Sequence, residues 1–253
     1  MARLFEGVGF FLHFSLAWII KQALSRRGFP SGQAASRKAA AFSISGPRPL
    51  RRVIAYVDGF NLYHAIDELR RPDLKWVDLR ALASSLCGAN ETLIETCYFW
   101  AFATWLPDET KKHREYVTAL KCAGVLTFMG HFKQKRRSCR NCGAQWIGHE
   151  EKESDVAMAS QIVADAFQDK FERALIVTAD SDIAPALRIV TQAFPDKTLD
   201  VIAPPGRHSH ARSLAPKLVI TPGRLARCLL PEKALADDGR LLFQRPEQYR
   251  PKD

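Results

Sequence analysis

Four aspartates fall at places along the chain where carboxylates could share a metal ion. Asp58 ends the apolar run RVIAYVD, Asp180 and Asp182 follow the apolar run ALIVTA, and Asp155 begins the amphipathic segment SDVAMASQIVADAF. Clustered carboxylates repel one another unless a cation shares them, and oxygen ligands of this kind suit Mg²⁺ or Mn²⁺. A water held by such a cation can be deprotonated to attack phosphorus, so the aspartates predict phosphate-ester chemistry.

Each of these aspartates also has an ordinary structural interpretation. Asp155 or Asp182 could cap a helix, because a carboxylate accepts from the free N–H groups of a first helical turn. Asp58, which precedes a glycine, could belong to a plain turn. Any one aspartate is more often structural than functional, and it is the set of four at element ends that favours a site.

The segments that carry the aspartates alternate between strand and helix patterns. Strands are expected over residues 52–59, 92–103, 125–132, 173–180, 198–205 and 218–221, and helices over 60–70, 78–87, 107–124, 154–171, 182–194 and 223–230. This alternation predicts an α/β fold, a doubly wound and mainly parallel sheet with helices on both faces. Sites in such sheets form beyond the carboxyl ends of the strands, where Asp58, Asp180 and Asp182 fall.

The net charge of +10 is a weak argument for a polyanionic partner. Between Glu6 and Asp58 there are eight lysines and arginines and no acid, so most of the excess positive charge lies in residues 1–51. We expect this range to be a disordered or targeting-like basic extension. A transit peptide, a weak membrane-surface anchor and a misassigned start remain open for it. Its apolar run, residues 8–20, is too short to span a bilayer comfortably, so no stable membrane insertion is expected.

Three segments, in order, resemble a known family. VIAYVDGFNLYHAI, EEKESDVAMASQIVADAF and ALIVTADSDIAPALRIV are similar to the three motifs of the NYN domain family, which are PIN-like nucleases of the LabA/DUF88 type. The resemblance covers about residues 52–231. It implies a three-layer α/β/α sandwich with a PIN-like, Rossmann-like sheet, and Mg²⁺- or Mn²⁺-dependent cleavage of RNA. It assigns the acidic ligands to Asp58, Asp155, Asp180 and Asp182.

Several polar residues are candidates for substrate contact. Asn61 matches the polar position of the first motif, which can orient a ligand or bond phosphate. Ser181 could donate to phosphate or cap the next helix, and Lys152 could offset substrate charge or be a solvated surface residue. The loop after the fifth expected strand carries Arg207, His208 and Ser209, which could contact phosphates or form an ordinary polar loop. Ala179 stands where many family members have glycine, and little effect is expected unless that position needs a positive φ.

The segment between the third expected strand and Asp155 is basic and carries a CxxC pair. Cys139 and Cys142 have the spacing that presents two thiolates to one Zn²⁺, and His131 and His149 flank them, so these four form a candidate structural zinc site over about residues 131–150. His149 is the stronger of the two histidines, because similar family members carry a histidine before the Glu-Glu-Lys segment. A redox pair, thiols completed by a second subunit and two reduced cysteines without a ligand remain open. The segment also carries five basic residues and a tryptophan, which suit single-stranded nucleic acid: Lys133, Lys135, Arg136, Arg137, Arg140 and Trp146.

Together these features predict a metal-dependent ribonuclease that cleaves single-stranded or structured RNA endonucleolytically. The alternative is a non-catalytic RNA-binding or regulatory module on the same fold. A small-molecule phosphatase is disfavoured, because the aspartyl-phosphate type needs a DxD at its first strand and this chain has Asp58-Gly59-Phe60. The cysteines show no disulfide framework, so a reducing, cytoplasmic location is expected. A homodimer is left open, and residues 232–253 are expected to form a C-terminal tail.

Overall fold

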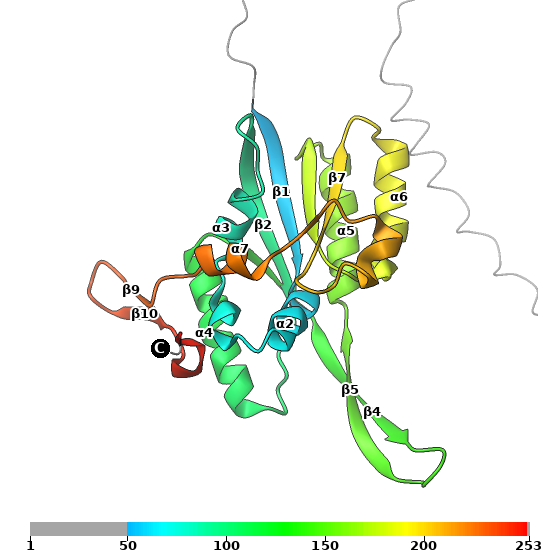
Figure 1. Ribbon diagram of the computed structural model, residues 1–253, viewed down its shortest axis with the longest axis vertical. Helices are drawn as coiled ribbons and strands as arrows, with labels where there is room; N and C mark the ends of the chain where they lie inside the picture. The colour runs from blue at the N-terminus through cyan, green and yellow to red at the C-terminus, as the bar shows by residue number, and fades with distance from the viewer. Residues whose placement is uncertain (1–49, 252–253) are drawn as a thin grey trace, which may run out of the picture. The chain divides into compact units, whose positions relative to one another are not determined.

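The computed structural model describes residues 50–251 (Figure 1). The basic extension expected over residues 1–51 therefore lies outside the described residues, apart from its last two positions. The strands are β1 (Arg51–Asp58), β2 (Glu91–Trp100), β3 (Leu126–Met129), β4 (His131–Ser138), β5 (Gln145–Lys152), β6 (Arg173–Val177), β7 (Thr198–Ala203), β8 (Leu218–Val219), β9 (Lys233–Leu235) and β10 (Leu241–Gln244). The α-helices are α2 (Gly59–Glu68), α3 (Leu79–Ser84), α4 (Pro107–Cys122), α5 (Ser154–Phe167), α6 (Ala184–Ala193) and α7 (Pro222–Arg227). Short 3₁₀ helices are η1 (Pro72–Trp76), η2 (Ser181–Ile183), η3 (His210–Leu214) and η4 (Glu247–Tyr249).

Six strands form one parallel sheet in the order β3-β2-β1-β6-β7-β8. The chain first winds outward from β1 through β2 to β3, and then returns to the other side of β1 to add β6, β7 and β8. All six expected strands are found, and the predicted α/β class is confirmed. The direction of winding reverses at β1 and β6, so the carboxyl ends of these two neighbours mark the place where an open sheet binds its ligands.

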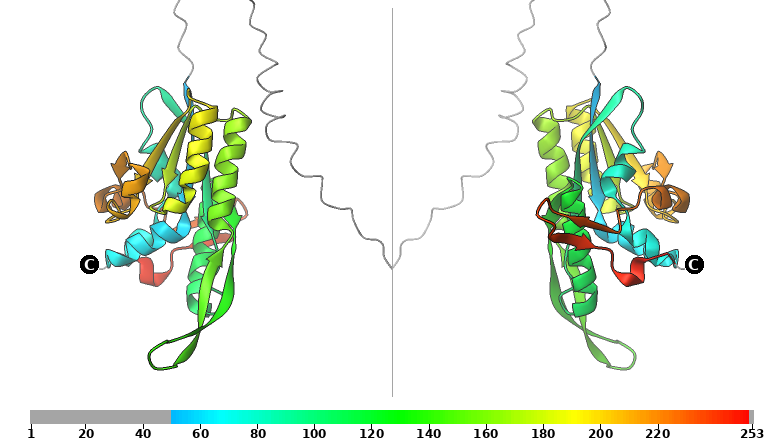
Figure 2. Two further views of the ribbon diagram at one scale, coloured as in Figure 1. Left: turned by 90° about the vertical axis from the view of Figure 1, so that its right-hand side faces the viewer. Right: turned by 90° about the vertical axis from the view of Figure 1, so that its left-hand side faces the viewer.

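Each face of the sheet is covered by helices and has its own apolar core (Figure 2). Along β1 the side chains alternate, so that Val53, Ala55 and Val57 join one core while Ile54 and Tyr56 join the other. The first core is packed by α2, η1, α3, α4 and α7, and the second by α5 and α6. A strand buried on both faces must be apolar along its whole length, which is why β1 and β6 read as continuous apolar runs.

The two edges of the sheet differ in how their charges are matched. At the amino-terminal edge, the guanidinium of Arg173 lies between Glu91 and Asp200, with an N–O distance of 2.6 Å to each. Charge-assisted bonds of this kind satisfy all three buried groups and tie β2, β6 and β7 together. The carboxyl edge, where the four aspartates lie, has no comparable basic partner among residues 50–251.

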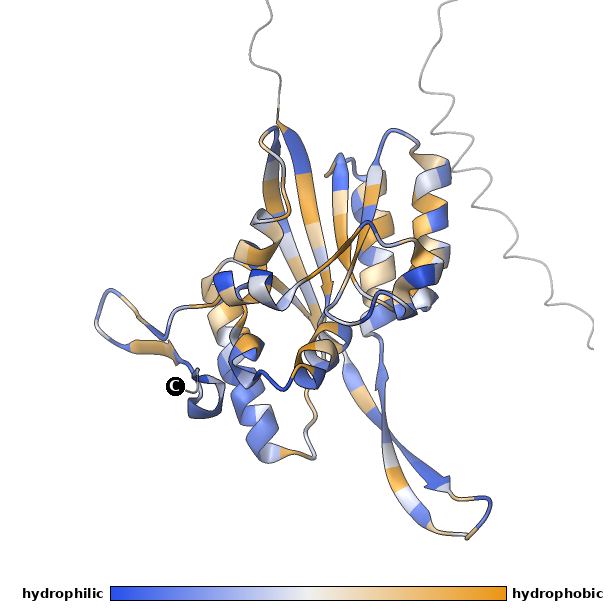
Figure 3. Ribbon diagram, in the orientation of Figure 1, coloured by the Kyte–Doolittle hydropathy of each residue, from blue (hydrophilic) through white to orange (hydrophobic). Residues whose placement is uncertain are grey.

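Two segments differ from what their sequence indicated. Residues 131–152, expected to be a basic loop, form the antiparallel hairpin β4–β5, which extends from the sheet and is largely hydrophilic (Figure 3). Residues after 231 include a second hairpin, β9–β10, whose Phe243 is buried in the first core against Trp76. Among the helices formed by residues 50–251, none has the length and apolar character of a membrane span.

The C-terminal hairpin gives a test of the fold. Phe243 is 3% exposed and its ring centroid lies 6.1 Å from that of Trp76, whereas Leu241 of the same strand is 50% exposed. We expect Phe243→Ala to lower the free energy of unfolding by about 3–5 kcal/mol, because a buried phenylalanine leaves a cavity. Leu241→Ala should change it by less than about 0.5 kcal/mol. Equal effects of the two substitutions in urea denaturation would show that the hairpin does not pack on the core.

Candidate active site

The structure brings the four predicted aspartates to one edge of the sheet. Asp58 is the last residue of β1, and Asp180 and Asp182 follow β6, which pairs with β1. Asp155 lies in the first turn of α5, which packs against β1 and β2. The pKa of Asp155 is raised by burial and then by the negative charges of Asp58, Asp180 and Asp182, so the four carboxylates interact electrostatically.

Asp58 is held in a fixed position by three hydrogen bonds. It is only 4% exposed, and its carboxylate accepts from the backbone N–H of Asn61 at 3.0 Å and from the Asn61 amide at 2.7 Å. The hydroxyl of Thr178 donates to it at 2.8 Å. Burial raises the pKa of Asp58, and these donors partly oppose that rise because they stabilise the ionised form. Asn61, in the first turn of α2, therefore supports the Asp58 carboxylate, which in turn caps that helix.

Thr178 was missed by the sequence analysis, although it links the two strand ends. Its hydroxyl donates to Asp58 and accepts from the backbone N–H of Asp180 at 3.0 Å. Asp180 in turn caps η2, because its carboxylate accepts from the backbone N–H of Asp182 at 2.9 Å. The structure thus places caps at Asp180 and Asp58, and not at Asp155 or Asp182, for which the capping alternative was given.

Glu151 is a fifth acid at this edge that the sequence analysis did not single out. It lies near the end of β5, and its carboxylate accepts hydrogen bonds from the hydroxyl and the backbone N–H of Ser154. Burial, followed by the charge of Asp58, raises its pKa. The chain between Glu151 and Asp155 turns sharply at Glu153, whose φ of 80° lies in the left-handed region. The EEKESD segment itself was the available signal, because it concentrates acids immediately before a helix.

Asp155 carries the strongest electrostatic signature of the site. Burial raises its pKa to about 7, assisted by the charges of Asp58, Glu151, Asp180 and Asp182. A carboxyl that titrates near neutrality marks a place where negative charge accumulates without compensation. Such a site favours the binding of a cation, which would lower the pKa again.

The candidate substrate-binding residues are distributed unevenly. Asn61, Asp180, Ser181, Arg207 and His210 line a hollow of about 280 Å³ together with Ala179. Ala179 has no positive φ, as the backbone of a non-glycine residue prefers. Arg207 also pairs with Glu68 of α2, which reduces its free positive charge.

The remaining candidates lie outside that hollow. His208 and Ser209 are exposed and are not among the residues that line it, and His210 takes the place expected for them. Lys152 donates to Glu150 at 3.0 Å, and its charge reaches Glu151. Lys152 thus pairs within the hairpin, and among residues 50–251 no salt bridge joins it to the four aspartates.

The four candidate zinc ligands do not come together within the hairpin. Cys139 and Cys142 lie in its turn, whereas His149 pairs with Gln134 and His131 pairs with Lys152 at its base. Strands rise about 3.3 Å per residue, so His149 lies roughly 13 Å and His131 more than 20 Å along the ribbon from the turn. Eight cross-strand residue pairs hold the hairpin together. His131 instead lies 3.2 Å from Glu153, and His149 stacks on Trp105.

The CxxC pair nevertheless has the local geometry of a thiolate turn. The pKa of Cys139 is lowered by hydrogen bonds from the backbone N–H groups of Cys142 and Asn141 and from the Cys142 thiol. Gly143, with a φ of 69°, lets the chain turn back so that its N–H reaches the carbonyl of Cys139 at 3.0 Å. Zinc remains a proposal for this pair alone, and it would need two ligands from outside the hairpin.

The carboxylate edge fits a hard divalent cation by the chemistry of its donors. Within residues 50–251, no three His, Cys, Asp or Glu side chains stand close enough to enclose an ion as they are placed. Mg²⁺ does not require such a cage, because it keeps several waters and uses one or two carboxylates. Asp58, Asp155, Asp180 and Asp182 offer only oxygen ligands, and the raised pKa of Asp155 indicates uncompensated charge.

Comparison with known proteins identifies the family. Residues 52–217, which make up more than half of the chain, match the NYN domain family, so the chain belongs to it. This confirms the resemblance seen in the sequence and places the fold among the PIN-like nucleases. A solved structure of a protein of unknown function from Vibrio parahaemolyticus is 15% identical, with a TM-score of 0.44 over 68% of this chain and 93% of that one. A comparison with curated protein sequences gives no match.

The raised pKa of Asp155 has a consequence for stability. Its pKa is about 7 in the folded chain and 3.8 as its ordinary value, so ionisation costs the folded state stability increasingly as the pH rises from about 4 to 7. We expect Asp155→Asn to stabilise the protein in EDTA at pH 8 by on the order of 1 kcal/mol, after solvent screening is allowed for, which is roughly 2–4 °C in Tm. The gain should disappear at pH 4.

A matched control for this measurement is Asp237→Asn, since Asp237 is exposed in the C-terminal hairpin. Its Tm should follow that of the wild-type protein at both pH values. Thermal unfolding by circular dichroism at pH 4 and pH 8 decides the matter. A destabilised Asp155→Asn at pH 8 would mean that the carboxylates do not repel one another as the structure indicates.

Proposed function

We propose that the chain is a Mg²⁺- or Mn²⁺-dependent ribonuclease that cleaves RNA endonucleolytically. The observation that carries this proposal is the convergence of Asp58, Asp155, Asp180 and Asp182, with Asp155 titrating near pH 7. Membership of the NYN family supports a nuclease-type hydrolase but names neither its metal nor its substrate. The metal requirement and the preference for RNA go beyond that family membership and belong to the proposal.

The roles of the residues follow from their surroundings. Asp58 is the fixed ligand, because three donors orient its carboxylate before any ion arrives. Asp155, Asp180 and Asp182 are the more accessible acids, and they would complete the oxygen ligands around an ion. A bound divalent cation would supply an activated water and offset charge on the phosphate. Ser181 and Arg207 line the adjoining hollow, where they can position a phosphodiester.

The basic hairpin supports a polyanionic substrate. Its five lysines and arginines are exposed on β4 and in the turn that follows it. The partner strand β5 leads from that turn to Glu151 and Asp155. Counterion release makes such contacts strongly salt-dependent and insensitive to sequence. The hairpin therefore fits a role in holding the nucleic-acid backbone, while the carboxylate edge acts on it.

The central test is a metal-titrated cleavage assay on mixed RNA and DNA. Asp58→Asn and Asp180→Asn should each lower RNA cleavage by at least about 100-fold, because each removes a charged ligand while keeping the shape of the side chain. Circular dichroism should show both variants folded. Wild-type cleavage rates in both variants would refute the assignment. RNA binding without metal-stimulated cleavage would instead support the non-catalytic RNA-binding module.

The link made by Thr178 gives a second, independent test. Thr178→Val removes the hydroxyl that donates to the buried Asp58 carboxylate, so the pKa of Asp58 should rise further and its ionised form should become less available. We expect Mn²⁺ affinity at pH 7 to fall about tenfold, measured by calorimetry, and to recover partly at pH 8.5. Thr178→Ser keeps the hydroxyl and should bind Mn²⁺ like the wild-type protein. An equal loss in both variants would point to packing and not to the hydrogen bond.

A further inference from the structure

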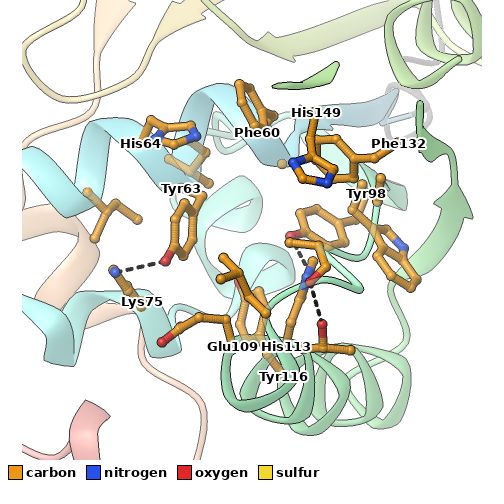
Figure 4. Close-up of a pocket in the computed structure, with 18 of the residues that line it drawn as sticks. Phe60, Tyr63, His64, Lys75, Tyr98, Glu109, His113, Tyr116, Phe132 and His149 are labelled. Atoms are coloured by element: carbon orange, nitrogen blue, oxygen red, sulfur yellow. Dashed lines mark hydrogen bonds between the residues drawn. The ribbon is translucent and has the colours of Figure 1, made fainter. Parts of the chain in front are cut away.

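A cavity of about 360 Å³ lies beside the carboxylate edge (Figure 4). Its walls come from α2, the end of β2, α4 and the base of the β4–β5 hairpin. Gly59 and Phe60, which directly follow Asp58, line it, so the cavity and the aspartates share one end of β1. Gly59 must lack a side chain here, because a Cβ atom would lie 2.6 Å from both the Phe99 carbonyl oxygen and the Tyr98 ring.

The walls of the cavity are mainly flat aromatic rings. Trp105 and His149 are stacked with their centroids 3.6 Å apart and their planes within 8° of each other. Phe132, from the same hairpin as His149, meets the Trp105 ring edge-on with the centroids 4.8 Å apart. Phe60 of α2 lies on another side of Phe132, with these two centroids 6.4 Å apart. Trp105 and His149 thus contact each other directly, and the outer faces of this ring cluster are the flat surfaces on which a planar aromatic group can stack. The volume falls within the range of small-molecule sites.

Two nitrogen atoms in these walls are buried without a hydrogen-bond partner. Among the described residues, neither Nε1 of Trp100 nor Nε2 of His149 has one, and both residues line the cavity. Trp100 is 5% exposed, and an indole N–H can only donate. Neither atom is reached by solvent, so both lie behind the surface of the cavity, and a ligand there would bond to them only after the side chains around them moved. The choice of ligand therefore rests on the aromatic faces and on the charge beside the cavity.

The charge around the cavity indicates which kind of planar ligand would bind there. The hairpin that supplies Phe132 and His149 also carries Lys133, Arg136 and Arg137, which form no salt bridge among the described residues. A polyanion bound along the hairpin would bring its own planar rings to the cavity mouth. Nucleic acid has both features, because its phosphates meet basic residues while its unstacked bases meet aromatic faces.

We propose that this cavity binds one unstacked nucleobase of the RNA, next to the phosphodiester that faces the aspartates. The proposal rests on the proposed function and adds a subsite to it. Trp105 and His149 provide the stacking face. A base held there fixes the register of the strand relative to Asp58, so the cavity determines which phosphodiester is presented.

The test measures binding in EDTA, so that it does not depend on cleavage. A labelled single-stranded 12-nucleotide RNA is titrated with the full chain by fluorescence anisotropy, and competitors of the same sequence each lack one base. One abasic position should weaken binding by about 5- to 150-fold, the loss expected for one base–aromatic stack, with smaller effects elsewhere. In Trp105→Leu that position-specific loss should vanish, because its stacking partner is gone.

Trp146→Leu is the matched control, since Trp146 is exposed on the same hairpin and is not among the residues lining the cavity. It should keep the position-specific loss. If Trp105→Leu is misfolded by circular dichroism, His149→Ala replaces it, because His149 is the other ring of the stacking face. Equal losses at every abasic position, or a loss that persists in the folded cavity variant, overturn the proposal.

The outcomes also separate this inference from the proposed function. Position-specific binding in EDTA without cleavage in Mg²⁺ or Mn²⁺ supports the base subsite and refutes the nuclease. Cleavage without a position-specific binding loss supports the nuclease and refutes the subsite. Binding of an apolar dye that RNA does not displace would assign the cavity to an apolar partner, and it also overturns the proposal.

Discussion

Repulsion between carboxylates is the constraint around which the carboxyl edge of the sheet is built. Folding drives Asp58 into a nearly dry position at the end of β1 and brings Asp155 close to it from α5. The backbone cannot relieve this by moving, because β1 and β6 are fixed by pairing on both sides and by two apolar cores. The remedy is local: Asn61 and Thr178 stabilise the charge of Asp58, while Asp155 holds its proton up to near neutrality.

The same constraint separates the two ends of the sheet by function. At one end Arg173 neutralises Glu91 and Asp200, so charge there serves only to join strands. At the other end no basic side chain among residues 50–251 forms a salt bridge with the four aspartates, so negative charge is left in excess and the pKa of Asp155 is raised to about 7. Under the proposed function, a bound cation would neutralise this charge and release the strain that it causes.

Much of this arrangement could be predicted from the sequence, and the reasons are specific. The central strands of the sheet are recognisable because burial on both faces favours unbroken apolar runs, as in residues 174–177. Asp58, Asp180 and Asp182 could be placed because they end such runs. Their grouping with Asp155 followed from the topology and from the resemblance to the NYN family.

The parts that could not be predicted depend on contacts between distant residues. The β4–β5 hairpin is largely exposed and so lacks the apolar alternation that is typical of a half-buried strand. For this reason no strands were predicted there, and the four residues proposed as zinc ligands are held apart by the hairpin. Thr178 and Glu151 gain their roles only through neighbours on other elements. The aromatic cavity draws its walls from α2, η1, β2 and the loop after it, α4, the β4–β5 hairpin and η4, and each of its rings taken alone is typical of a core residue.

The free edges of the β4–β5 ribbon have a further consequence. Because β4 and β5 pair only with each other among the described strands, each leaves an outer row of backbone N–H and C=O groups facing solvent. Exposed edges of this kind can recruit another strand and begin aggregation, and lysine and arginine are among the residues that prevent it. The positive charges of the ribbon would thus act as gatekeepers that keep copies of the chain apart in the cell. Substitutions of these charges are therefore constrained by solubility, apart from any role in the proposed binding of nucleic acid.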